Sequence, residues 1–206
     1  MFISSEDIKC FNRNGFIVVK NLISEDLIRE QFNNIIIVLK KNLLSLKKFN
    51  RTDFWNTQEF HEAIINFRQL DSNMFSSFYD SVQSSVLLSR LVMSKNVLQC
   101  VSEILGVQTC ELSSISQECR FDVPFDKRNW LDWHQDWSYF PSNYLGEKSL
   151  TVWIPMTKIT KEMGYLKICS ESHKNGPCSE LNTKWNVEKI SNFNADNYTT
   201  SEKIIN

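Results

Sequence analysis

The sequence predicts an α+β fold, in which helices pack against a sheet that closes into a barrel or a double-sheet sandwich. Residues up to about 106 carry apolar side chains at helical spacing, whereas later residues contain short alternating runs typical of strands. The length of 206 residues suits one domain with a sizeable core. We therefore predict a single domain over residues 1–206, with a helical part at about 1–106, a β core at about 107–176 and a polar tail at 177–206.

The helical part begins with one short strand and continues as helices. The β-branched run over residues 16–19 predicts the strand. Ser24 is a favourable N-cap, and apolar side chains then recur three and four apart, which predicts an amphipathic helix over residues 25–47. His61 lies among apolar residues and is interpreted as structural. Three further helices are predicted over residues 57–70, 75–93 and 97–105.

The second half of the chain has the patterns of strands and loops. Residues 109–121 alternate weakly and predict one or two strands, and residues 122–130 predict a loop. Apolar and other residues alternate clearly over residues 150–154, a predicted strand that stops at Pro155. Residues 165–169 predict a further strand after a glycine.

Charge and composition exclude several classes of partner. The net charge of -1 gives no electrostatic reason to expect nucleic acid or an anionic membrane as a partner. The six cysteines lack metal-ligand spacing, which favours free thiols in a reducing compartment. The first residues include acidic side chains where a signal peptide needs basic ones, and the longest apolar run, residues 35–39, is too short to cross a bilayer. We therefore expect a cytoplasmic protein.

The most informative motif is a histidine and an aspartate two residues apart. In an extended backbone, His134 and Asp136 project to the same face, so an imidazole and a carboxylate converge. Two histidines and one carboxylate form the facial triad that holds non-haem Fe(II). A chance pair at the surface is the alternative interpretation. Aromatic residues that could shield such a site, or simply form core, surround the pair: Trp133, Trp137, Tyr139 and Phe140.

Several blocks in a fixed order carry a family resemblance. These blocks are residues 134–140, 150–155, 162–166 and 170–174, preceded by an opening block at about residues 11–24. Together they span about residues 8–176, and this stretch resembles the phytanoyl-CoA dioxygenase family.

The resemblance implies a double-stranded β-helix (jelly-roll, cupin-like) core with N-terminal helices packed outside. It also implies a dioxygenase that depends on Fe(II), 2-oxoglutarate and O2 and hydroxylates a small organic or acyl substrate. Carried over by motif, His134 and Asp136 are the catalytic iron ligands. Gln135 and Trp153 match positions that line the co-substrate pocket.

The family's second iron-binding histidine, and the arginine that binds 2-oxoglutarate, have no counterpart in the sequence. His173 belongs to a turn block that precedes that histidine in the family, and no histidine or arginine follows it. Three explanations stay open: an incomplete C-terminal end, a divergent metal site that uses two protein ligands or recruits His173, or an inactive jelly-roll that serves as a binding or structural protein. A cupin-like isomerase is a weaker alternative. A jelly-roll incomplete at its C-terminus would have an open sheet edge, which favours self-association.

Overall fold

The computed structural model describes residues 2–43, 57–114, 116–124, 126, 133–136, 148–160, 163–164, 166–176 and 200–201. The chain divides into two compact units. The first unit comprises residues 1–20, 98–113 and 130–206, and the second comprises residues 21–97 and 114–129. The described residues are mostly helical.

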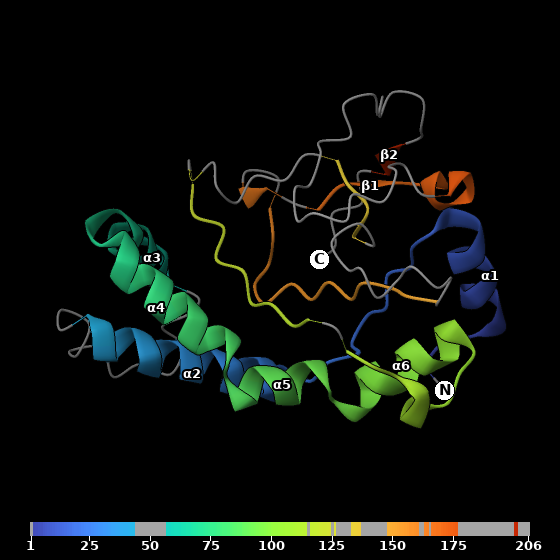
Figure 1. Ribbon diagram of the computed structural model, residues 1–206, viewed down its shortest axis with the longest axis horizontal. Coiled ribbons are helices and arrows are strands. Elements are labelled where there is room, and N and C mark those ends of the chain that lie inside the picture. The colour runs from blue at the N-terminus through green and yellow to red at the C-terminus, as the bar shows by residue number, and fades with distance from the viewer. Residues whose placement is uncertain are drawn as a thin grey trace, which may run out of the picture. The chain divides into compact units, whose positions relative to one another are not determined.

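The described residues of the second unit contain four complete helices, which Figure 1 shows in blue to green. In chain order they are α2 (Glu25–Asn42), α3 (Gln58–Leu70), α4 (Ser72–Gln83) and α5 (Val86–Val92). Helix α2 packs against α4 and α5, and α3 packs against α4. The prediction of a helix over residues 25–47 is confirmed as far as Asn42, and residues 44–47 lie outside the described residues.

Aromatic side chains form much of the core of the second unit. Phe67 of α3 lies 5.5 Å from Phe75 and 5.7 Å from Phe78 of α4, measured between ring centroids. All three rings are buried. Burying one such side chain stabilises a fold by about 1.5–3 kcal/mol. From α2, the side chains that complete this core recur at helical spacing: Phe32, Ile35, Ile36 and Leu39.

The single helix predicted over residues 75–93 is wrong, because the chain forms two helices there. Helix α4 ends at Gln83, and α5 begins after Ser85, whose hydroxyl accepts a hydrogen bond from the backbone N–H of Leu87. A serine that caps a new helix competes with continuation of the preceding one. Helix α6 (Lys95–Leu105) follows, two residues longer at its start than the predicted helix. None of the helices in the described part of the chain is long and apolar enough to cross a membrane.

A glutamine holds the extended segment that follows the helices of the second unit. The side chain of Gln83 accepts a hydrogen bond from the backbone N–H of Cys119 at 2.6 Å and donates one to its carbonyl at 2.8 Å. These are the two bonds that a neighbouring strand would provide. Residues 109–121 were predicted to contain one or two strands, but they form the 3-10 helix η3 (Thr109–Glu111) and no strand within the described residues 112–114 and 116–121.

The first unit begins with a helix that apolar periodicity did not predict, α1 (Ser5–Asn14). Ser4 and Asp7 form a capping box, in which each side chain accepts from the other residue's backbone N–H, at 3.1 Å and 2.9 Å. The hydroxyl of Ser4, which donates to Asp7 Oδ2 at 2.6 Å, and the backbone N–H of Ser4 hold the pKa of Asp7 below its ordinary value. The helix ends at Gly15, in the left-handed conformation with φ 82°. Residues 16–19, predicted to be a strand, form none.

The first unit also contains a two-stranded antiparallel sheet. Strand β1 (Ile168–Cys169) pairs with β2 (Thr200–Ser201), with Ile168 opposite Ser201. The predicted strand at 165–169 is confirmed for its last two residues, and residue 165 lies outside the described set. Residues 150–154 form no strand; a strand needs a paired backbone as well as an alternating pattern, and no pairing partner is described for them. The jelly-roll core stays a prediction.

The cysteines that the structure describes are free thiols: Cys10, Cys100, Cys110, Cys119 and Cys169. Burial raises the pKa of Cys119 to about 11 and also raises the pKa of Cys100 and Cys169. The thiolate is the nucleophile and metal ligand, so these three buried side chains are poor candidates for either role. Cys178 lies outside the described residues.

Candidate metal centre

His134 and Asp136 lie next to each other in the first unit, as the motif predicts. The imidazole Nε2 of His134 is 3.1 Å from the carboxylate Oδ1 of Asp136. The two side chains are partly buried, with 27% and 41% of their surfaces exposed. An imidazole nitrogen and a carboxylate oxygen that converge in this way, and that solvent can still reach, are a pair of donors suited to a transition metal.

Thr151 orients the aspartate. Its hydroxyl donates a hydrogen bond of 2.5 Å to Oδ2 of Asp136, the carboxylate oxygen that does not face His134. Partners of this kind fix the direction of a metal-binding carboxylate. The sequence prediction did not assign Thr151 to the site. The available signal was its position in the run at residues 150–154, two residues before Trp153.

Gln135 ties the motif to a turn 41 residues later. Its amide Nε2 donates a hydrogen bond of 3.1 Å to the backbone carbonyl of Gly176. The side chain between the two candidate ligands is thus anchored, which restrains the backbone that carries both of them. A role for Gln135 in the co-substrate pocket stays a prediction.

Trp153 lies at the surface of the described structure, with 39% of its surface exposed. Its neighbour Val152 is also exposed, so the predicted in-and-out alternation of this run is not seen in the side-chain burial. Of the aromatic residues around the motif, Trp133 is half-buried, whereas Trp137, Tyr139 and Phe140 lie outside the described residues. An apolar wall around the histidine and the aspartate therefore stays a prediction, as does a co-substrate role for Trp153.

The structure places His173 at the C-terminus of α1. Its ring Nε2 is 3.0 Å from the backbone carbonyl oxygen of Asn12. The backbone N–H of Glu171 donates to the carbonyl of Asn14 at 2.8 Å. The last carbonyls of a helix have no partner within the helix, and the turn satisfies two of them. Glu171 adopts the left-handed conformation with φ 69°. This conformation costs a non-glycine residue about 1–2 kcal/mol, and the contacts of the turn with α1 maintain it.

Comparison with models of protein families shows to which family the chain is related. The model of the phytanoyl-CoA dioxygenase (PhyH) family matches residues 11–202. The chain belongs to this family. No curated protein and no solved structure matched the chain. The matched region contains His134, Asp136, Thr151 and the turn with His173, and members of the family are generally Fe(II)- and 2-oxoglutarate-dependent oxygenases.

The donor pair fits two positions of the iron site expected in a phytanoyl-CoA dioxygenase family member. Two metal–ligand bonds of about 2.1 Å at a right angle place the donor atoms roughly 3.0 Å apart. The observed distance between Nε2 of His134 and Oδ1 of Asp136 is 3.1 Å. Within the described residues, no group of three histidine, cysteine, aspartate or glutamate side chains is placed to hold a metal. The described residues therefore offer two donor side chains at this place, those of His134 and Asp136.

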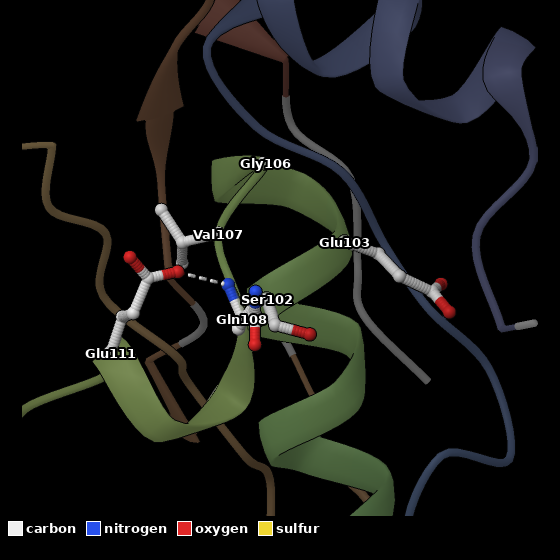
Figure 2. Close-up of a pocket in the computed structure, with 6 residues that line it drawn as sticks. All are labelled: Ser102, Glu103, Gly106, Val107, Gln108 and Glu111. Carbon is white, nitrogen blue, oxygen red and sulfur yellow. Dashed lines mark hydrogen bonds between the residues drawn. The ribbon is translucent and has the colours of Figure 1, made fainter.

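A shallow hollow lies at the C-terminal end of α6 (Figure 2). The residues that line it precede His134 and Asp136 in the sequence. The residues that line it are Ser102, Glu103, Gly106, Val107, Gln108 and Glu111. Glu103 and Glu111 are already engaged: Glu103 accepts from the backbone N–H of Ile3 at 3.1 Å, and Glu111 from that of Gln108 at 2.6 Å. The hollow contains none of the residues that the family resemblance assigns to catalysis, and we give it no role in the reaction.

Proposed function

We propose that the chain is a non-haem Fe(II)- and 2-oxoglutarate-dependent dioxygenase that hydroxylates a small organic or acyl substrate. The observation that carries the proposal is the 3.1 Å approach of His134 Nε2 to Asp136 Oδ1, in a chain of the phytanoyl-CoA dioxygenase family. His134 and Asp136 are the proposed iron ligands. Bound Fe(II) would supply the position at which O2 and 2-oxoglutarate react: one oxygen atom would enter a C–H bond of the substrate, and the other would end in succinate as 2-oxoglutarate loses CO2.

His134 provides a neutral nitrogen donor. As a ligand, its Nε2 must present a lone pair, so any proton on that nitrogen leaves when the metal binds. The nearby carboxylate of Asp136 provides a negative charge that favours a cation at the same place. Metal affinity is therefore expected to fall as the pH is lowered, because protons compete for both groups.

Thr151 and Gln135 keep the two donors in position. The hydroxyl of Thr151 occupies Oδ2 of Asp136, which leaves Oδ1 directed toward His134. The amide of Gln135 anchors the intervening residue to Gly176. A donor pair that is already oriented loses less conformational freedom when the metal binds, and this raises the affinity. Trp153 and Gln135 are also the residues proposed to line the 2-oxoglutarate pocket.

The proposal is tested by anaerobic titration of the protein with Fe(II) and then with 2-oxoglutarate. We expect Fe(II) to bind, and the weak visible absorption of the iron–2-oxoglutarate chelate to develop. His134→Ala and Asp136→Ala are each expected to abolish binding while the circular dichroism spectrum is unchanged. His61→Ala is the matched control, since it removes a histidine that lies on α3 in the second unit.

Each outcome separates the candidate functions. Binding of Fe(II) without the chelate band would favour a metal protein that does not use 2-oxoglutarate. Unchanged Fe(II) affinity in both ligand variants would contradict the assignment of His134 and Asp136. If wild-type protein binds neither Fe(II) nor 2-oxoglutarate, the polypeptide is an inactive family member, and a binding or structural role replaces the proposed reaction.

A further inference from the structure

The turn at residues 171–176, which we call the capping turn, is fixed to α1 at three points. His173 Nε2 meets the carbonyl oxygen of Asn12 at 3.0 Å, and the Glu171 N–H donates to that of Asn14 at 2.8 Å. The third point is Gly15: a Cβ atom built on this glycine would lie 2.4 Å from His173 Nδ1. The imidazole therefore packs directly on the backbone of Gly15. Any other residue at position 15 would place its Cβ atom in the space that the imidazole occupies.

The other end of the capping turn is fixed to the candidate metal centre. After the 3-10 helix η8 (Ser172–Asn175), the carbonyl of Gly176 accepts the hydrogen bond from Gln135. A continuous path of hydrogen bonds and covalent chain thus leads from the C-terminus of α1, through His173 and Gly176, to the residue between the two proposed ligands. All of these residues belong to the first unit.

We propose that His173 is a positioning residue for the metal centre, which acts through the capping turn and Gln135 to maintain the geometry of His134 and Asp136. The inference rests on the proposed function, and it deepens it by assigning a role to the chain's last histidine other than that of a ligand. Of the two ring nitrogens, Nε2 is directed at the carbonyl of Asn12, and Nδ1 packs against Gly15. A carbonyl oxygen accepts hydrogen bonds, so Nε2 carries the proton in this contact and has no lone pair to donate to a metal.

The first experiment measures binding of Mn(II) alone, from the loss of the electron paramagnetic resonance signal of the free ion. His173→Ala is expected to weaken binding about 10-fold, the lower end of the effect of removing an outer partner of a metal ligand. His173→Gln places an amide N–H near Asn12 and is expected to restore most of the affinity. His61→Ala is the control for loss of a histidine and is expected to bind like wild type. Circular dichroism and thermal unfolding establish that each variant is folded.

A second variant tests the same path without changing the contact with α1. Gln135→Met has a similar shape but cannot donate to Gly176, and it should weaken Mn(II) binding about as much as His173→Ala, roughly 10-fold. Wild-type affinity in both His173→Ala and Gln135→Met would overturn the positioning role. Complete loss of binding in both His173→Ala and His173→Gln would also overturn it, because this result would make His173 a ligand.

The metal-free protein separates this inference from the proposed function. In its ¹H–¹⁵N spectrum, the side-chain amide signals of Gln135 are expected to shift in His173→Ala and to keep their positions in His61→Ala. If they do not shift, the coupling through the capping turn is overturned even where wild type binds Mn(II). If they shift and wild type binds no Mn(II), the proposed function is wrong while the coupling between His173 and Gln135 stands.

Discussion

Replacing Gly15 with alanine tests how closely the capping turn packs on α1. Gly15 has φ +82°, a conformation that favours glycine, and a Cβ at this position would meet His173 Nδ1 at 2.4 Å. Gly106 is the matched control because it ends α6 with φ +69°, yet a Cβ there would meet nothing within 4 Å. The two substitutions thus share the cost of the backbone conformation and differ in the contact with His173.

The expected magnitudes follow from these two contributions. Alanine in the left-handed conformation costs about 1–2 kcal/mol, and this should be the whole effect of Gly106→Ala. Gly15→Ala must in addition displace His173, with loss of its hydrogen bond to Asn12 and of the neighbouring one from Glu171 to Asn14. Each hydrogen bond contributes about 0.5–1.5 kcal/mol, so the total for Gly15→Ala is about 3.5 kcal/mol.

Urea unfolding, followed by a probe in the first unit, measures the difference. Gly15→Ala should lower the free energy of unfolding by about 2 kcal/mol more than Gly106→Ala does. On the Gly15→Ala background, His173→Ala should cost almost nothing further, because the contact is already lost. Equal destabilisation by the two glycine substitutions would refute the packing argument.

Two further predictions concern a buried ion pair and the candidate ligand Asp136. Asp126→Ala leaves the guanidinium of Arg68 without its partner at 2.8 Å, where the two side chains are only 8% and 12% exposed, and should destabilise the second unit by about 3 kcal/mol. Asp122→Ala removes a carboxylate from an exposed pair and should cost less than about 1 kcal/mol in the same thermal unfolding assay; similar losses would contradict the argument. Thr151→Val removes the hydrogen bond to Asp136 and should weaken Mn(II) binding about 10-fold with little change in stability, whereas Thr151→Ser should retain the affinity. Wild-type affinity in Thr151→Val would exclude Thr151 from the site.

Local sequence patterns predicted most of the helices. They did not predict contacts between residues that lie far apart in the sequence. The apolar spacing in α2 predicted that helix because one of its faces is buried along its length. Helix α1 was missed because it has no buried residue, and its signal was the capping box of Ser4 and Asp7 together with Gly15. The break between α4 and α5 depends on Ser85, a cap that hydrophobic periodicity does not register. The segment at Cys119 pairs with a glutamine side chain, which no alternation in sequence predicts.

The candidate site shows the same limit. The spacing of His134 and Asp136 predicted their convergence, because side chains two positions apart in an extended backbone project to the same face. Thr151 reaches Asp136 from 15 positions away, and His173 reaches Asn12 from 161 positions away. Tertiary packing brings such partners together, and the sequence around one of them does not indicate the other.

The division of the chain also has a consequence for its synthesis on the ribosome. The second unit is complete once residue 129 has been made, and it can fold while the rest is still being translated. Helix α1 is made before the second unit, but the residues that cover its last carbonyls come 161 positions later, a delay of roughly 10–30 s at typical translation rates. Helix α1 therefore reaches these partners only after the second unit has been made.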